Sequence, residues 1–173
     1  QEGSMSSDFK EVEPGLITDN AFKLIGTDWM LITAGTPQDF NTMTANWGGL
    51  GYLWNKNVCF CFIRPQRHTY GFVEKADTFT LSFFEEKYRD ILNFCGAKSG
   101  REVNKVKETA LVPVHSTSGG IYFDQARLVL ECRKIYSQDI DGKNFLDQKI
   151  QTFYPNKDYH RMYIGEVVRC LVR

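Results

Sequence analysis

Runs of β-branched and aromatic residues recur along the whole chain, and few segments with helical spacing separate them. A doubly wound sheet needs regular alternation of strands and helices, which this sequence does not show. We therefore predict a mainly β fold, an antiparallel Greek-key barrel with peripheral helices. Its strands are expected at residues 29–34, 42–47, 58–63, 78–84, 121–123, 126–136 and 161–172.

Short helices and turns are predicted to connect these strands. Asp19 can cap a first helix and Thr69 a second, because both side chains accept hydrogen bonds from free backbone N–H groups. A third helix is predicted over residues 87–94, with Gly96 as its C-terminal stop. Residues 144–154 are expected to form a polar excursion with one short helix.

The last strand carries an apolar stripe with one interruption. Glu166 breaks the stripe, and it either lies near a sheet rim or meets a basic partner. The residues predicted to share one face of this strand are Met162, Ile164, Val168, Cys170 and Val172.

Length and composition favour a single domain. A chain of 173 residues with 42% hydrophobic content can bury one full core, and a second domain would be cramped. We assign residues 8–173 to this domain. Residues 1–7 are interpreted as a disordered N-terminus or a vector scar, because Gly3-Ser4-Met5 is typical of expression vectors.

The charge balance excludes several classes of partner. Lys and Arg number 21 and are matched by 21 Asp and Glu, so the formal net charge is zero. Such a chain has no net field to attract nucleic acid or an anionic membrane over long range. No apolar run approaches the roughly 20 residues of a membrane span. We therefore expect neither nucleic acid nor membrane as a partner.

The five cysteines lack the spacing of a zinc site or a disulfide framework. Their odd number and scatter fit a reducing compartment, and we expect the protein to be cytoplasmic. Cys59 and Cys61 lie two apart in a predicted strand, so both thiols point to one face, where we expect packing rather than metal binding. Cys95 is likewise expected to pack rather than to carry redox chemistry.

Two segments on either side of the predicted strand 58–63 have the composition of a flavin site. Residues 41–47 are rich in small and hydroxyl side chains beside one indole, so backbone N–H groups can approach a flat heterocycle that Trp47 covers. In the second segment, Arg67 and Thr69 lie at the expected start of a helix. There free N–H groups, the helix dipole and a guanidinium can together hold a phosphate. An exposed strand end is the alternative for residues 41–47.

Two glycine-containing segments imitate nucleotide-binding loops but differ from them at positions that matter. Residues 49–54 place Trp54 where the dinucleotide fingerprint needs its third glycine. Residues 96–99 place Ala97 where a phosphate loop has glycine before its lysine. The cations in and after this second segment are typical of a solvated helix face: Lys98, Arg101, Lys105 and Lys107.

Several short strings follow one another in a characteristic order: residues 25–31, 41–47, 64–70, 78–84, 95–101, 128–132 and 159–167. No string is specific alone, but their order and spacing extend over nearly the whole chain. In this arrangement the sequence resembles the flavin reductase-like family, in particular the flavoredoxin type of FMN-binding split barrel. The resemblance implies that residues 8–173 form a single FMN-binding split-barrel domain.

The resemblance also implies which residues hold FMN. The loop that holds the flavin ring is matched by Thr42, Met43, Thr44, Ala45, Asn46 and Trp47. The strand end that faces the cofactor is matched by Phe62, Ile63 and Arg64. The phosphate side is matched by Arg67, His68, Thr69, Lys98 and Ser99. A surface salt bridge is the alternative role for Arg64.

His160 is the candidate catalytic residue. Relatives often carry Gly-Asp-His at the start of this strand, whereas the present chain has Asp158-Tyr159-His160. The resemblance places His160 near the nicotinamide or the rim of the flavin. A hydrogen-bonded structural histidine is the alternative.

The function implied by the resemblance is that of an oxidoreductase whose chemistry resides in its cofactor. NADH or NADPH would deliver hydride to bound FMN, and a free flavin or a redox protein would take up the electrons. The alternative is a non-enzymatic FMN electron carrier like flavoredoxin. A haem site in the same barrel lacks any axial-ligand context. Split barrels of this type resemble half-sites that a second subunit completes, so a homodimer is expected.

Overall fold

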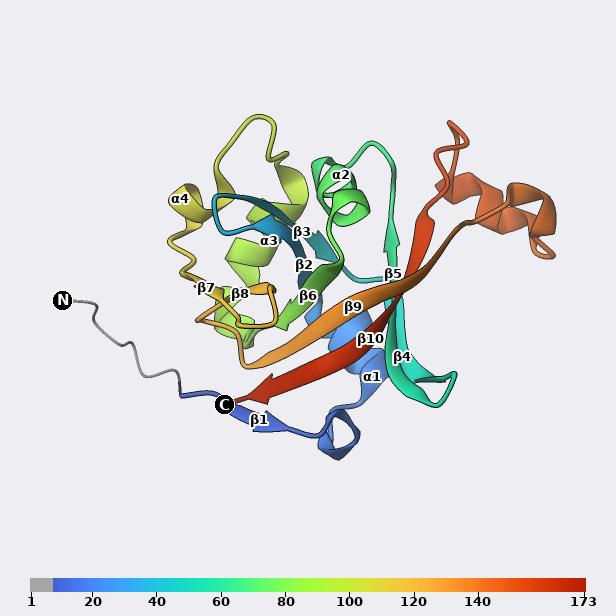
Figure 1. Cartoon of the computed structure of the whole chain (residues 1–173). Coiled ribbons are helices and arrows are strands. Elements are labelled where there is room, and N and C mark those ends of the chain that lie inside the picture. Colours follow the sequence, from blue (N-terminus) through green and yellow to red (C-terminus); the bar gives the residue numbers. More distant parts are fainter. Residues whose placement is uncertain (1–7) are drawn as a thin grey trace.

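The computed structural model describes residues 8–173, and the segment 1–7, predicted to be a disordered N-terminus or a vector scar, lies outside them. The described residues form one curved antiparallel sheet with helices around it (Figure 1). The strands of the sheet are β1 (Lys10–Val12), β2 (Met30–Thr36), β3 (Asp39–Ala45), β4 (Gly48–Leu53), β5 (Lys56–Ile63), β6 (Thr78–Phe83), β9 (Leu128–Asp139) and β10 (Arg161–Val172). A separate two-stranded hairpin consists of β7 (Pro113–His115) and β8 (Ile121–Phe123).

Hydrogen bonds do not close this sheet into a complete barrel. The strand order is β3-β2-β6-β9-β10-β5-β4, with β1 added beside β10, so β3 and β4 lie at opposite ends of the path. These two strands are consecutive in the chain, and only Asn46 and Trp47 join them. This two-residue link therefore crosses the open seam of the barrel. The predicted antiparallel split barrel with peripheral helices is confirmed.

A glycine directly after the link lets β4 pass close to its neighbour. Gly48 has φ 157°, and a Cβ atom there would lie 2.7 Å from the carbonyl oxygen of Phe60. The hairpin from β4 to β5 then closes through Trp54 and Asn55, with φ values of 54° and 57°. Positive φ at both central residues is the geometry of a type I′ turn, whose twist matches that of the paired strands.

The helices are short and lie outside the barrel. They are α1 (Ala21–Lys23), α2 (His68–Lys75), α3 (Arg89–Ala97) and α4 (Lys105–Thr109). Short segments of 3-10 or π helix are η1 (Pro14–Leu16), η2 (Leu24–Asp28), η3 (Glu86–Tyr88), η4 (Gly142–Asn144) and η5 (Gln148–Phe153). Both α2 and α3 contact β2 and β3, beside the seam. No helix within residues 8–173 has the length and apolar character needed to cross a membrane.

Both predicted helix caps are wrong. The side chain that caps α1 is Asn20, whose oxygen accepts from the backbone N–H groups of the first turn. The carboxylate of Asp19 instead accepts from Arg127 at 2.7 Å. Thr69 lies inside α2, and its buried hydroxyl accepts from the Asn41 side chain at 2.8 Å. In each case a residue distant in sequence forms a hydrogen bond with the side chain that was predicted to cap the helix.

Gly96 also has a different role from the one predicted. It lies within α3, which ends only at Ala97, with Lys98 as the C-cap residue. A Cβ atom at Gly96 would approach Thr44 of β3 to 3.3 Å. The glycine therefore lets α3 pack closely on β3 rather than ending the helix.

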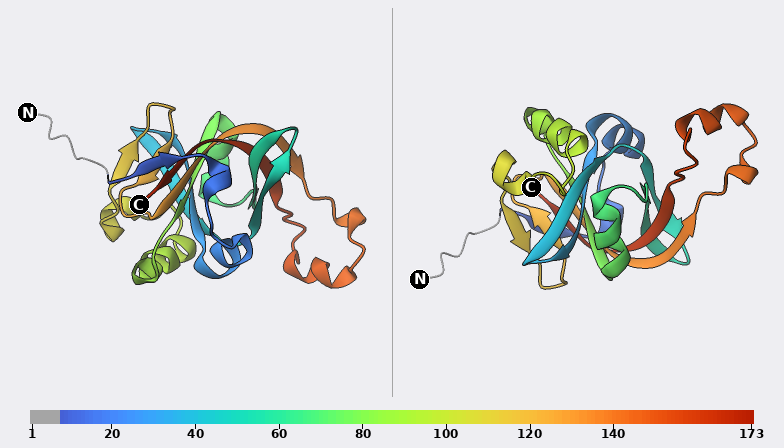
Figure 2. Two further views of the ribbon diagram at one scale, coloured as in Figure 1. Left: turned by 90° about the horizontal axis from the view of Figure 1, so that it is seen from below. Right: turned by 90° about the horizontal axis from the view of Figure 1, so that it is seen from above.

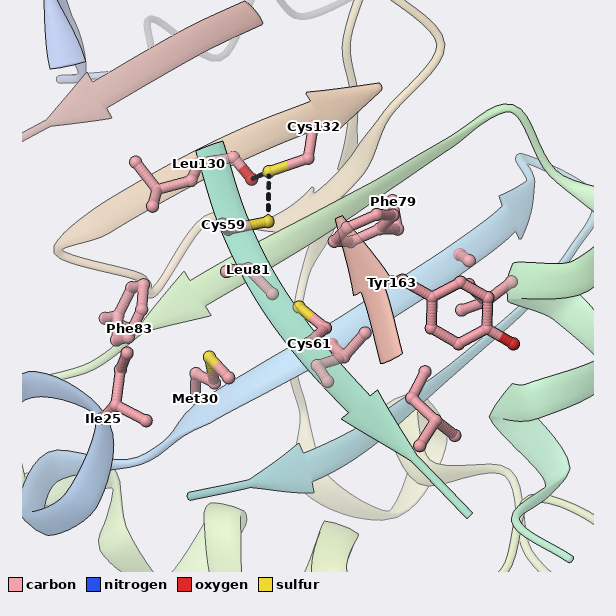
Figure 3. Close-up of a cluster of buried hydrophobic side chains, with 14 of the residues drawn as sticks. Ile25, Met30, Cys59, Cys61, Phe79, Leu81, Phe83, Leu130, Cys132 and Tyr163 are labelled. Carbon is pink, nitrogen blue, oxygen red and sulfur yellow. Dashed lines mark hydrogen bonds between the residues drawn. The ribbon is translucent and has the colours of Figure 1, made fainter. Parts of the chain in front are cut away.

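The barrel interior holds a cluster of apolar side chains that includes four cysteines, and Figure 3 labels Cys59, Cys61 and Cys132 among them. Cys59 and Cys61 are both buried on β5, and the Cys59 thiol donates to the Cys132 sulfur at 3.4 Å. The two sulfurs meet beside Gly165 of β10, the pairing partner of Cys59. All five cysteines are buried, and Cys59, Cys61 and Cys95 belong to the apolar clusters, so the prediction that they pack in the core is confirmed.

The predicted apolar stripe of β10 is wrong at Val168, whereas Cys170 is buried in the core and Val172 packs against it. The pairing of β10 with β9 shifts between Ile164 and Gly165 and again between Val167 and Arg169. Bulges of this kind change which face a side chain occupies, and Val168 is 45% exposed. For Glu166, the alternative of a basic partner holds, since its carboxylate contacts Arg133 at 2.8 Å and Lys56 at 3.1 Å.

The segment between β9 and β10 projects away from the barrel as an arm (orange in Figures 1 and 2). It contains the predicted polar excursion, folded into η4 and η5. Phe145 packs against Tyr154 and Tyr159, with ring centroids 6.0 and 5.9 Å apart. At its end, the arm returns to the barrel through Tyr154 and His160, which are hydrogen-bonded to each other. These aromatic contacts give the arm a small core of its own.

We predict that Gly165→Ala destabilises the protein by about 1–3 kcal/mol, the usual cost of overpacking a filled core. The new Cβ would lie 2.7 Å from the Phe79 ring and 2.9 Å from Cβ of Cys132. Gly71→Ala in α2 is the matched control, because its Cβ would meet no atom within 4 Å. The control should gain up to about 1 kcal/mol of helix propensity. Urea unfolding measures both changes, and a Gly165→Ala variant as stable as the wild type would contradict the packing described.

Candidate functional site

A cavity of about 200 Å³ opens at the seam of the barrel, and we call it the ring cavity. Its walls come from the end of β3, the link between β3 and β4, the end of β5 and the start of β10. Most residues predicted to surround a flavin ring gather here, although they come from separate parts of the chain. The lining residues are Met43, Thr44, Ala45, Asn46, Trp47, Phe62, Arg64, Arg67 and His160.

Trp47 and His160 form an aromatic wall of the ring cavity. Their ring centroids are 5.2 Å apart, and Trp47 also meets Phe153 edge-on at 5.4 Å. The indole is 42% exposed, whereas His160 is only 9% exposed. Nδ1 of His160 lies 2.7 Å from the Tyr154 hydroxyl. The wall thus has one accessible ring and one ring held in place by a hydrogen bond.

The imidazole of His160 is neutral at physiological pH. Burial, reinforced by the positive charge of Arg64, lowers the pKa of His160 to about 4. A neutral imidazole can donate one hydrogen bond and accept another, but it brings no charge to the cavity. His160 is hydrogen-bonded within the structure, as the structural alternative supposed. It also lines the ring cavity, where the resemblance places it.

Arg64 anchors the arm to the barrel. Its guanidinium donates to Asp158 and to the carbonyl oxygen of Phe153, each at 2.8 Å. It also lies over the Tyr154 ring, 4.9 Å from the centroid. These contacts occupy the guanidinium with protein partners, as the salt-bridge alternative supposed, so Arg64 shapes the ring cavity more than it adds free charge.

A second cavity, of about 210 Å³, adjoins the first at Arg67, and we call it the anion cavity. It lies between the start of α2 and the segment that follows α3. Four of its side chains are cationic and none carries a carboxylate, although the chain as a whole has no net charge. The lining residues are Asn41, Gln66, Arg67, His68, Thr69, Gly96, Ala97, Lys98, Ser99, Gly100, Arg101 and Lys105.

Arg67 is the cation shared by both cavities. Its side chain is partly buried, and burial lowers the pKa of its guanidinium. Its backbone forms turn hydrogen bonds, but within residues 8–173 the guanidinium has neither a hydrogen-bond partner nor an ion pair. Removing a charge from water without a partner is costly. This arrangement indicates a site built for an anionic ligand.

The start of α2 adds backbone donors to the anion cavity. Helix α2 begins at His68, where the first N–H groups have no partner within the helix. Asn41 fixes this turn through its hydrogen bond to Thr69. On the opposite side, a Cβ atom at Gly100 would collide with the Asn41 carboxamide and lie 2.9 Å from the His68 ring. Only a glycine at position 100 lets the two sides of the cavity approach this closely.

Two predicted site residues do not present their side chains to either cavity. Ile63 is fully buried in the barrel core. Thr42 is buried as well, with its hydroxyl 2.8 Å from that of Thr33 on the paired strand. Alternation along β5 turns Ile63 into the barrel core, whereas Thr42 lies on the face of β3 opposite to Met43, which belongs to that core. Any contact of theirs with a ligand would have to come from the backbone.

Several residues of the site were not predicted. Lys105 was assigned to a solvated helix face, but it is only 5% exposed, and its ammonium donates to the carbonyl oxygens of Thr42 and Cys95. Trp29 has φ 69° and lines a third cavity of about 240 Å³ that also includes Arg67. Asn41 belonged to the flavin-like segment but carried no assigned role. No local sequence signal distinguishes Lys105 from the exposed Lys107.

Comparison with known protein families identifies the chain. The model of the flavin reductase like domain matches residues 22–173, which include both cavities and nearly the whole barrel. The chain therefore belongs to the flavin reductase-like family. No curated protein matches the sequence significantly.

Solved structures share the fold at low sequence identity. An FMN-binding protein from Thermus thermophilus is 20% identical with a TM-score of 0.66, covering 94% of this chain and 78% of its own. Flavoredoxin of Desulfovibrio vulgaris is 19% identical with a TM-score of 0.67, covering 95% and 77%. An NADH:FAD oxidoreductase from Streptomyces globisporus, solved with NAD and FAD fragments, is 16% identical with a TM-score of 0.62, covering 83% and 73%. At these identities the likeness shows the shared fold alone.

Proposed function

We propose that this member of the flavin reductase-like family binds FMN, with the flavin ring in the ring cavity and the phosphate in the anion cavity. The observation that carries the proposal is the partly buried guanidinium of Arg67, which lacks a protein partner within residues 8–173 and lines both cavities. A ligand that joins a flat heterocycle to a phosphate would use both cavities at once.

The residues around the two cavities suit the two ends of FMN. The backbone of residues 43–47 can donate to the oxygens and nitrogens of a flavin ring, and Trp47 can cover the ring. For the phosphate, the donors are the first N–H groups of α2 together with four side chains of the anion cavity. Those side chains are Arg67, Thr69, Lys98 and Ser99.

We predict that Arg67→Ala and Lys98→Ala each weaken FMN binding by about 10- to 100-fold. This range corresponds to the loss of one charge-assisted hydrogen bond, about 1.5–3 kcal/mol. Riboflavin lacks the phosphate, so its weaker binding should stay within about twofold of the wild-type value. Flavin absorbance titrations measure both dissociation constants.

The control for these substitutions is Lys87→Ala, which removes an exposed lysine outside both cavities. It should leave both flavins bound as in the wild type. Equal losses of affinity for FMN and riboflavin in Arg67→Ala would show that Arg67 does not bind the phosphate. A protein that gains no flavin spectrum with excess FMN would refute the cofactor assignment itself.

We further propose that the protein is an NAD(P)H-dependent flavin reductase. Bound FMN would supply hydride chemistry, accepting hydride from NADH or NADPH and passing electrons to a free flavin or a redox protein. The chain's part is to hold the reactants and to orient them at the ring cavity. Neutral His160 suits this part, because Tyr154 fixes its orientation and it adds no cation beside the ring.

We predict that NADH or NADPH bleaches the oxidised flavin band of the FMN complex under anaerobic rapid mixing. His160→Ala should slow this step about tenfold or more while changing FMN affinity by less, since an orienting contact acts on transfer geometry. Reduction no faster than that of free FMN by both nicotinamides would overturn the enzyme assignment. The electron-carrier alternative would then stand.

A homodimer is also proposed, supported by the exposed aromatic residues near the seam, including Trp47 and Phe153. Sedimentation of the FMN complex at micromolar concentration tests it, and a monomer with FMN fully bound would refute it. Five free thiols support a cytoplasmic location, which cell fractionation tests.

A further inference from the structure

Lys105 is a deeply buried cation in the wall of the anion cavity. It is 5% exposed, and its ammonium donates to the carbonyl oxygens of Thr42 at 2.7 Å and Cys95 at 2.8 Å. Lysine is almost never buried to this extent without a charged partner, yet within residues 8–173 no carboxylate pairs with it. An ammonium has three N–H donors, so one remains beyond the two carbonyl bonds.

We propose that Lys105 is a positioning residue of the anion cavity and that a phosphate dianion binds there tightly only while the Lys105 ammonium is protonated. This inference rests on the proposed function only in that FMN would supply the phosphate. The chemistry of the cavity is the same for inorganic phosphate, and the experiments below separate the two sources.

The two carbonyl bonds explain the positioning role. Thr42 belongs to β3, which continues into the lining of the ring cavity, and Cys95 belongs to the last turn of α3, where the segment lining the anion cavity begins. One ammonium therefore ties together the elements that carry the two cavities. Loss of its charge would release both carbonyl groups within the buried interior, where unpaired acceptors are unfavourable.

The groups that face Lys105 come from three elements. Burial, opposed by the Cys95 thiol and reinforced by Arg67, lowers the pKa of Lys105 to about 8. Burial raises the pKa of the Cys95 thiol, and the charge of Lys105 opposes that rise. Burial and the charges of Arg101 and Lys105 lower the pKa of His68, and Asp39 opposes them. Arg67 remains charged throughout, and Lys98 and Arg101 complete the cations of the cavity.

The sign of the pH dependence follows from this arrangement. A phosphate dianion favours the protonated ammonium and raises its pKa. Below about pH 8 the ammonium is charged before and after binding, so affinity is at its maximum. Above that pH, binding must take up a proton, and affinity should fall by up to about tenfold per pH unit until the pKa of the bound state is reached.

The most direct test is carbon NMR of the lysine Cε groups in the flavin-free protein, with and without saturating inorganic phosphate. The lysine with the lowest titration midpoint should be Lys105, and phosphate should move this midpoint upward. A midpoint that phosphate leaves unchanged would overturn the inference, whether or not FMN binds. Failure to acquire a flavin spectrum is a separate result that would refute the proposed function alone. This measurement needs no variant, so it stands even where a substitution impairs folding.

The second test compares FMN and riboflavin affinities between pH 7.5 and 9.5. In the wild type the ratio of FMN affinity to riboflavin affinity should fall with rising pH. Lys105→Met keeps a long unbranched side chain without the charge. It should lower the ratio at pH 7.5 and abolish the dependence of the ratio on pH. Lys105→Arg should give a high ratio that does not change with pH, because the guanidinium stays charged over this range. The exposed Lys107→Met is the control and should keep the wild-type profile. A wild-type slope in Lys105→Met would refute the role of Lys105.

Discussion

The charge of Arg67, which has no partner among residues 8–173, is the constraint around which the proposed site is organised. A partly buried guanidinium normally finds a carboxylate, and other arginines of this protein do, such as Arg64 with Asp158 and Arg127 with Asp19. Around Arg67 the fold instead collects further positive charge and a helix start, with no carboxylate in the wall of the anion cavity. The cost of this arrangement in the free protein would be offset by binding of the proposed anion.

The topology of the barrel places this charge beside the ring cavity. The two ends of the strand path are consecutive strands, so the chain must cross the seam within the link formed by Asn46 and Trp47. The crossing leaves room for the ring cavity, and the start of α2 brings Arg67 to its margin. The fold thus places an aromatic surface beside a cationic cavity, and the proposed FMN would use both.

Much of the fold and of the site was predictable from sequence, because local patterns determined it. Alternating apolar residues marked the strands, and the small residues around Trp47 marked the ring cavity. The failures share one cause, namely partners distant in sequence. Asp19 joined Arg127 instead of capping α1, bulges in β10 exposed Val168, and Lys105 turned inward to two carbonyl groups that lie 63 and 10 residues away in the chain. Such partners become visible only once the chain is folded.

Phosphorus NMR of bound FMN tests most directly whether the anion cavity binds the phosphate. The second pKa of a free phosphate monoester is about 6. In the cationic cavity we predict that the bound phosphate stays dianionic at least about one pH unit below that value, because Arg67, Lys98 and Lys105 favour the charged form. A bound phosphate that titrates like free FMN would contradict the account.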